Sequence, residues 1–255
     1  MSRREKRELR EKQIVSATIS LLSEKGFLDV RMSDVAKKTN IAMGTIYSHF
    51  EGKEDLLVAC ACTLHLNDRI LIHSIFEQPI PAIEKIIAAV QTNWLVTQSH
   101  PDLIEINNLS LMPSVWRRAT PYRVNEMNAL HIELAGLFLE VVVEAIHQDI
   151  GCYEHMNSEE LGKLCNYFTH GMWGLCVGLS STAQSGYSST LCPEGEDDSY
   201  QHFITNYINF LRGYGWQEEK PKAVFDRCLK IANKGLDQTE WFSKPAQRKG
   251  DSLAG

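Results

Sequence analysis

Hydroxyl and imidazole side chains gather in one short segment near the N-terminus. Thr45, Tyr47, Ser48 and His49 lie within five consecutive residues. Such groups exchange hydrogen bonds with phosphate oxygens and with base edges, and they gain little from packing in a core. Three lysines lie close by in the chain: Lys37, Lys38 and Lys53. This combination favours contact with a nucleic acid.

Two short helices joined by a turn are expected to hold these side chains. Residues 33–39 and 43–49 form the two helical segments, and Asn40 between them tolerates the left-handed conformation that ends a helix. Ile46 and Phe50 are four residues apart and share the inward face of the second segment. The pattern predicts a helix-turn-helix over about residues 31–50, with its second helix as the reader.

The same segment carries a family resemblance. The run IAMGTIYSHF at residues 41–50, followed by KEDL at 53–56, resembles the DNA-binding core of TetR-type bacterial transcriptional regulators. The resemblance covers about Arg10 to Leu57. It implies a homodimer that binds double-stranded DNA at a palindromic operator and releases it when the body of the protein binds a small molecule. A repressor is therefore the expected form of regulator.

The resemblance assigns DNA contacts to individual positions, and three of them depart from the family's pattern. The expected contacts come from Arg31, Ser33, Met43, Gly44, Thr45, Tyr47, Ser48, His49 and Lys53. Tyr47 and Lys53 are expected to contact phosphates, and Met43, Thr45 and His49 to contact bases. Arg31 and Ala42 stand where the family places capping hydroxyls, so each cap is expected to be weaker by about 1 kcal/mol. Met43 replaces a frequent lysine, which removes one phosphate contact.

Charge is unevenly distributed along the 255 residues, whose net charge is −6. Residues 1–53 hold 11 Lys/Arg and 7 Asp/Glu, a net of +4, which leaves 15 against 25 in residues 54–255, a net of −10. A basic end on an acidic body predicts that only the first part meets a polyanion. A solvated charged helix is the alternative that charge alone leaves open.

The rest of the chain shows helical periodicity without a strand pattern, so we predict an all-α fold. A first helix is expected from about Lys6 to Lys25. The charged residues 1–8 at the N-terminus are expected to be frayed. The expected organisation is a DNA-binding domain over 1–52, a helical ligand-binding and dimerisation domain over 53–242, and a disordered tail over 243–255. Further helices are expected over these ranges: 53–76, 83–98, 102–111, 122–148, 158–181, 200–212 and 222–233.

Two groups of residues in the body are candidates for the effector pocket and the dimer interface. Gly171, Gly174 and Gly178 share one helical face, which favours close packing across a dimer, with packing inside one subunit as the alternative. Aromatic and polar side chains of the central helices suit an apolar or aromatic effector, although aromatic residues at helical spacing are more often core. The candidate pocket residues are Trp94, Asn107, Trp116, His131, Phe138, Tyr167 and Trp173.

Metal, enzyme and membrane signals are weak. Cys60-x-Cys62-x-x-His65 has only positions 62 and 65 on one helical face, so we predict no metal site and no cofactor. No phosphate-binding loop, nucleophile elbow or zinc-protease motif predicts an enzyme. The charged N-terminus lacks a signal peptide, and the uncharged run 164–193 is too polar for a membrane span. Seven cysteines without a repeated spacing fit a reduced cytoplasmic protein.

Two functions from different classes remain at this point. The first is a sequence-specific DNA-binding transcriptional regulator. The second is a helical small-molecule-binding or sensory protein whose N-terminal unit docks a protein partner. A protein-docking face would carry more apolar side chains than the segment around Thr45 and Tyr47 does, which favours DNA.

Overall fold

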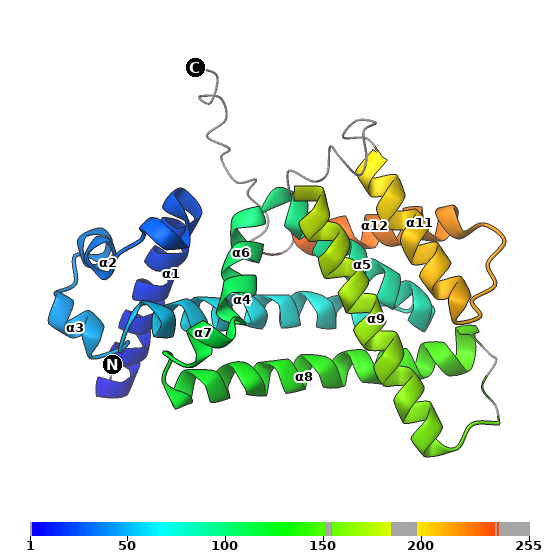
Figure 1. The fold of residues 1–255 in the computed structure, drawn as a ribbon, viewed down its shortest axis with the longest axis horizontal. Coiled ribbons are helices and arrows are strands. Elements are labelled where there is room, and N and C mark those ends of the chain that lie inside the picture. Colours follow the sequence, from blue (N-terminus) through cyan, green and yellow to red (C-terminus); the bar gives the residue numbers. More distant parts are fainter. Residues whose placement is uncertain (1, 151–152, 154, 185–197, 238, 240–255) are drawn as a thin grey trace. The chain divides into compact units, whose positions relative to one another are not determined.

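The computed structural model describes residues 2–150, 153, 155–184, 198–237 and 239 (Figure 1). Within these ranges every regular element is a helix, which confirms the predicted all-α fold. The helices are α1 (Arg3–Asp29), α2 (Met32–Thr39), α3 (Met43–Tyr47), α4 (Lys53–Phe76), α5 (Ala82–Ser99), α6 (Pro101–Ser110), α7 (Pro113–Trp116), α8 (Pro121–Ala145), the π-helical turn η1 (Ile146–Ile150), α9 (Ser158–Gln184), α11 (Asp198–Gly213) and α12 (Pro221–Asp237). The predicted tail over 243–255 lies outside the described residues.

The contacts between residues group the chain into two compact units. The first comprises Met1–Ile70 and Pro101–Leu134, and the second comprises Leu71–His100 and Ala135–Gly255. The helix-turn-helix is thus grouped with the first part of α4, with α6 and α7, and with the first part of α8. The predicted division after residue 52 stays a prediction.

The first helix begins earlier than predicted, at Arg3 rather than about Lys6. The Ser2 hydroxyl accepts a hydrogen bond from the Glu5 backbone N–H at 3.1 Å, and the Ser2 N–H donates to the Glu5 carboxylate at 2.9 Å. This reciprocal capping box satisfies two backbone donors that a helix start otherwise leaves unpaired. The segment expected to be frayed is therefore helical. Gly26, with φ of 74°, interrupts the helix near its end at Asp29.

A small apolar core holds α2 and α3 against each other and α2 against α1. Val35, Ile46 and Phe50 are at most 1% exposed. Asn40 ends α2 in the left-handed conformation, with φ of 55°, and its N–H donates to the Ala36 carbonyl. The predicted helix–turn–helix geometry is confirmed, although the second helix ends at Tyr47, two residues earlier than expected.

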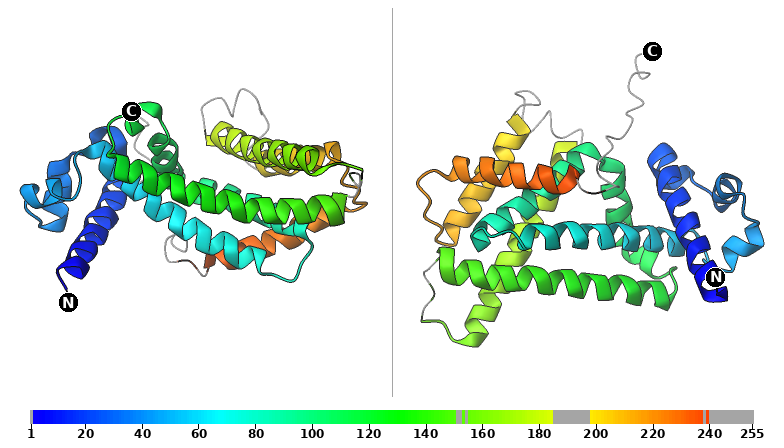
Figure 2. Two further views of the ribbon diagram at one scale, coloured as in Figure 1. Left: turned by 90° about the horizontal axis from the view of Figure 1, so that it is seen from below. Right: turned by 180° about the vertical axis from the view of Figure 1, so that it is seen from behind.

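In the second unit, α5 is the central helix and packs against α9, η1 and α12. α12 lies along α5 (Figure 2). The fully buried Gln91 amide donates to the Tyr200 hydroxyl at 2.8 Å and to the Phe225 carbonyl at 3.0 Å, so one α5 side chain bonds to both α11 and α12. Arg227 on α12 is paired with Glu84 on α5 at 2.7 Å. These interactions explain how the added C-terminal helix is held on this unit.

Among the described residues, α4 is the one helix long and apolar enough to cross a membrane by length and composition. In the structure 56% of its apolar 18-residue stretch is buried, as in a core helix. Its apolar character is therefore accounted for by packing within the protein, and the segment is weak evidence for a membrane span.

Candidate nucleic-acid interface

The reader helix α3 is anchored by one face and exposes the other. Ile46 is fully buried, whereas Tyr47 is 50% exposed and Met43 is 37% exposed. Gly44 is exposed too, and a side chain there would meet no atom within 4 Å. Thr45 is half-buried. The accessible groups of α3 are thus one phenol, one thioether, one hydroxyl and a stretch of bare backbone, which suits close approach to a groove.

The two helix starts behave as the departures from the family pattern predicted. Neither Arg31 at the start of α2 nor Ala42 at the start of α3 makes a side-chain cap hydrogen bond to the helix. At α2 the Arg31 N–H instead donates to the Asp34 carboxylate at 3.1 Å. Arg31 and Ser33 are both exposed at this end of α2, where a phosphate could accept from them.

His49 does not lie on the exposed face, and the prediction of a base contact from its ring needs correction. Its side chain is 4% exposed, and Nδ1 lies 3.5 Å from Glu11 Oε2 on α1. Because α3 ends at Tyr47, His49 follows in a turn that directs the ring toward α1. In the same turn the Ser48 hydroxyl donates to the Thr45 carbonyl at 2.6 Å. His49 is therefore a positioning residue for the reader.

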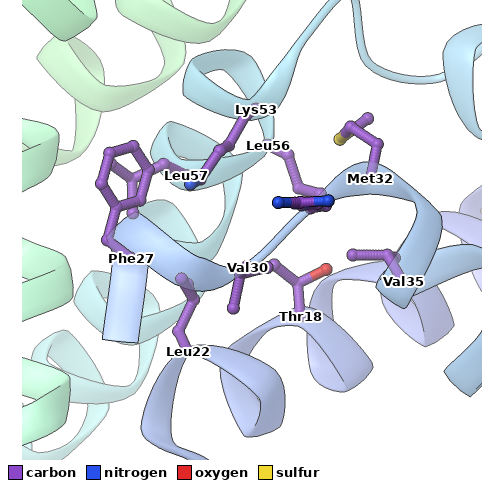
Figure 3. A pocket seen from close by; sticks show the side chains of 10 residues that line it. Thr18, Leu22, Phe27, Val30, Met32, Val35, Lys53, Leu56 and Leu57 are labelled. Carbon is purple, nitrogen blue, oxygen red and sulfur yellow. The ribbon is translucent and has the colours of Figure 1, made fainter. Parts of the chain in front are cut away.

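Lys53 is held by the protein itself at the edge of a small, mostly apolar pocket (Figure 3). Its ammonium lies 4.2 Å from the centre of the Phe27 ring and donates to the Leu28 carbonyl at 3.3 Å. Burial lowers the pKa of this lysine. Leu56, Val35 and other aliphatic side chains complete the lining, so the pocket is a packing gap between α1, α2 and α4. A phosphate contact from Lys53 would have to compete with the Leu28 bond.

The structure adds a basic stripe that the sequence analysis missed. Arg3, Arg4, Lys6, Arg7 and Arg10 on α1 line one groove together with Ser48 and His49 at the end of the reader. The Arg7 guanidinium donates to the Ser48 carbonyl at 3.3 Å, which joins the stripe to the reader. The Ser-x-x-Glu capping signal at residues 2–5 was the feature that could have revealed the early helix start.

The predicted pocket residues fall into both units. Asn107, Trp116 and His131 belong to the first unit, and Trp94, Phe138, Tyr167 and Trp173 belong to the second. Trp116 donates from Nε1 to the Ser110 carbonyl at 2.6 Å. The role of these seven residues as effector contacts stays a prediction.

Most of the aromatic side chains in the second unit pack as core. Trp94 is 4% exposed, with its ring 4.6 Å from the Phe203 ring, and Phe138 is 3% exposed, with its ring 5.1 Å from the Trp173 ring. Tyr167 differs, because 66% of it is exposed on α9. The structure therefore accounts for Trp94 and Phe138 by ring packing, whereas it leaves Tyr167 accessible.

The three glycines on one face of α9 differ in their surroundings. A Cβ atom on Gly171 would lie 2.8 Å from the Phe210 ring of α11, so this glycine permits close packing inside the chain. Gly174 and Gly178 are exposed, and a Cβ atom there would meet nothing within 4 Å. The internal explanation thus holds for Gly171, whereas the described side chains around Gly174 and Gly178 do not require a glycine.

Cysteine clusters do not supply a metal site within the described ranges, where no group of three or more His, Cys, Asp or Glu side chains is suited to hold a metal ion. Cys60 and Cys62 are both buried, and burial raises the pKa of each thiol, that of Cys62 to about 12. A protonated, buried thiol behaves as a small apolar side chain.

Comparison with known proteins links the N-terminal part of the chain to a family and the whole described fold to solved structures. Residues 14–60 match the model of bacterial regulatory proteins of the tetR family. The chain is 30% identical over 92 residues to an uncharacterized HTH-type transcriptional regulator of Haemophilus influenzae, a match that covers 36% of this chain and 49% of that protein. The matched part is thus about half the length of that relative. The family match over residues 14–60 includes α2 and α3, the two helices of the helix-turn-helix.

Two solved structures share the architecture. RolR in complex with resorcinol aligns at a TM-score of 0.56 with 17% identity, covering 88% of this chain and 97% of that one. The transcriptional regulator FadR from Bacillus subtilis in complex with stearoyl-CoA aligns at 0.51 with 17% identity, covering 86% and 98%. At this identity the likeness describes the fold. Together with the match over residues 14–60, it supports the resemblance: the N-terminal part of the chain carries the helix-turn-helix of the tetR family of bacterial regulatory proteins, and the chain shares the all-α fold of these structures.

We predict that the basic stripe adds sequence-independent phosphate contacts. Replacing Arg3, Arg4 and Lys6 with Gln should flatten the slope of log K against log salt by about 0.9 for each phosphate that is no longer neutralised. Fluorescence anisotropy with duplex DNA at several salt concentrations measures the slope. The control replaces the exposed α12 lysines Lys222, Lys230 and Lys234 with Gln, which changes the net charge equally. Equal slopes for the wild type and the α1 variant would show that the stripe stays off the DNA.

Proposed function

We propose that the protein is a sequence-specific DNA-binding transcriptional regulator, and in particular a repressor. The observation that carries the proposal is the α3 face, where Tyr47, Met43 and the Gly44 backbone are exposed beside the basic stripe of α1. The family match over residues 14–60 supports the same conclusion. The relatives named above are described as transcriptional regulators, which supports a protein without enzymatic activity acting on DNA in the cytoplasm.

The alternative is a sensory protein whose N-terminal unit docks a protein partner. Such a face would be centred on apolar side chains, with charges at its rim. Here five basic residues line the groove beside the reader, and Tyr47 presents a hydroxyl. Polyanion binding accounts for both features, so DNA is the favoured partner.

We predict that Tyr47 contributes to affinity for every DNA sequence. Its exposed hydroxyl can donate to a phosphate, and a hydrogen bond to a charged group is typically worth about 1.5–3 kcal/mol. Tyr47→Phe and Tyr47→Ala should therefore both weaken binding roughly 10–100-fold on operator and unrelated duplexes. Anisotropy titrations on duplexes selected from a random pool measure this.

The control for Tyr47 is Leu28→Ala, which removes a side chain that is 90% exposed in the same unit. It should bind as the wild type does. If the wild type selects no sequence from the pool, or if both Tyr47 variants keep full affinity, the reader face is assigned wrongly.

A homodimer is the second part of the proposal. A two-fold dimer needs matching half-sites, and helix-turn-helix dimers place these about 34–36 Å apart or at multiples of that distance. We propose that the exposed part of the glycine face, Gly174 and Gly178, packs against the partner. The support is that, among the described residues, no atom outside the local helix backbone lies within 4 Å of either added Cβ position.

We predict that Gly174→Leu separates the dimer without unfolding the chain. Leu would enter open space within one subunit but would overfill a close interface, which typically costs about 1–3 kcal/mol. Sedimentation equilibrium measures the dimer, and operator affinity should fall with it. Gly162→Leu is the matched control, because Gly162 is also exposed on α9 with no atom within 4 Å of an added Cβ. An intact dimer of Gly174→Leu would exclude this interface.

Release by a small effector is the third part of the proposal. The two structural neighbours described above were solved with resorcinol and with stearoyl-CoA, both of which present apolar surface. The mixed aromatic and polar residues of the central helices support an apolar or aromatic effector for this chain as well.

We predict that effector and operator weaken each other's binding by the same factor. An effector that binds the DNA-bound form less well must lower operator affinity, and thermodynamic reciprocity then fixes the converse. Couplings of about 1–3 kcal/mol correspond to roughly 5–150-fold effects. Calorimetric titration of candidate ligands, with and without operator duplex, measures both sides. For a tight ligand, identical affinities in the two titrations would rule out release by that ligand.

A further inference from the structure

Two histidines far apart in the sequence meet inside the first unit. His65 on α4 and His131 on α8 bring their Nε2 atoms to 3.3 Å, and their rings meet edge to face with centres 4.8 Å apart. One turn further along, Arg69 on α4 pairs with Glu133 on α8 at 2.5 Å. The histidine pair is thus set between two helices that a second interaction also joins.

The distance between the two nitrogen atoms fits a shared metal ion. Zinc–nitrogen bonds measure about 2.0–2.1 Å, so two imidazole nitrogens at a tetrahedral angle lie roughly 3.3–3.4 Å apart. A direct N–H···N hydrogen bond is the other arrangement with this distance, although 3.3 Å is longer than the usual range of about 2.7–3.2 Å for N–H donors. The surrounding groups distinguish the two.

The neighbourhood offers a candidate third ligand and a nearby carboxylate. The Asn107 side chain on α6 interacts with the His65 ring, and its buried Oδ1 atom makes no hydrogen bond of normal geometry. A buried oxygen left in this state is costly, and a cation at the histidine pair would satisfy it. Asp68 Oδ2 lies 4.0 Å from the other ring nitrogen of His65, beyond hydrogen-bond distance, so its side chain would have to move closer before it could orient the ring as carboxylates orient many metal-binding histidines.

We propose that His65 Nε2, His131 Nε2 and Asn107 Oδ1 bind a divalent late transition metal ion such as Zn²⁺, with water as the fourth ligand. Imidazole and oxygen donors in this number match the preferences of such ions, and three protein ligands leave one position open. The inference is independent of the proposed DNA binding.

The proposed site shares only His65 with the Cys60-x-Cys62-x-x-His65 pattern of the sequence. Cys60 and Cys62 precede His65 on α4, and both thiols are buried; the Cys60 thiol lies 3.9 Å from the Val15 carbonyl on α1. His131 lies 66 positions after His65, and only the pairing of α4 with α8 brings the two together. A half-buried His131 leaves a route for the ion from solvent.

The test is metal binding by the full chain, freed of any affinity tag and treated with a chelator. Calorimetric titration with Zn²⁺ should show one ion bound per chain, and Co²⁺ should give the intense visible absorption of a tetrahedral site. His131→Phe keeps the ring and its edge-to-face contact but removes both nitrogens, so Zn²⁺ affinity should fall at least tenfold. Asn107→Asp replaces an amide oxygen with a carboxylate, a stronger ligand for Zn²⁺, so affinity should rise.

His73→Phe is the matched control, because His73 is an exposed histidine on the same helix, and its affinity should equal that of the wild type. Circular dichroism establishes that each variant is folded. Should His131→Phe fail to fold, the Co²⁺ spectrum of the wild type and the Asn107→Asp titration still decide. The proposal is overturned if the wild type takes up no stoichiometric Zn²⁺, if Co²⁺ gives only the weak spectrum of octahedral coordination, or if folded His131→Phe binds as the wild type does.

Discussion

The buried guanidinium of Arg123 is the interaction on which the first unit depends. Its side chain is 6% exposed, pairs with Glu126 at 2.8 Å and with Glu11 of α1, and lies 5.1 Å from the centre of the Phe50 ring. Removing a charge from water is costly, so a buried pair is held by its partners and contributes more to geometry than to net stability. Arg123 therefore holds the first turn of α8 against α1 and against Phe50, which follows the reader helix.

Glu11 connects this ion pair to the DNA-reading helix. One of its oxygens contacts Arg123, and the other lies 3.5 Å from His49, directly after the reader. Another acid, the buried Asp55, accepts from the backbone and hydroxyl of Thr120 at 2.9 and 2.7 Å, just before α8 begins. The orientation of α3 is thus set by α1 and α8 as well as by its own helix-turn-helix. A shift of α8 within this unit must strain one of these bonds or move the reader.

The proposed metal site also involves α8, through His131. His131 follows Arg123 by eight residues, which is about 12 Å along α8 at about 1.5 Å per residue. An ion bound between His65 and His131 would fix the distance between α4 and α8 close to the point where α8 contacts Glu11. Metal occupancy and reader position would then be linked by a rigid helix, without any contact between the ion and DNA.

The local sequence predicted most of the helices. It predicted poorly which side chains of different helices contact each other. Asn40, Gly26 and the prolines that begin α6, α7 and α8 mark boundaries through their own backbone preferences, and the observed helices begin or end at or close to them. The four-residue helix α7 was missed because it is too short for periodicity. The burial of His49 depends on Glu11, and the approach of His131 to His65 depends on helix pairing, so neither is encoded in local spacing.

The short reader helix limits how many side chains of the proposed DNA interface can recognise bases. α3 has five residues and exposes few groups that can distinguish bases, namely those of Met43, Thr45 and Tyr47. Much of the affinity must then come from phosphate contacts, for which the α1 stripe offers positive charge. Because such contacts carry no sequence information, specificity in the proposed complex would rest on the few α3 groups and on their repetition in a second subunit. The proposed dimer would therefore contribute base recognition that one short reader helix lacks.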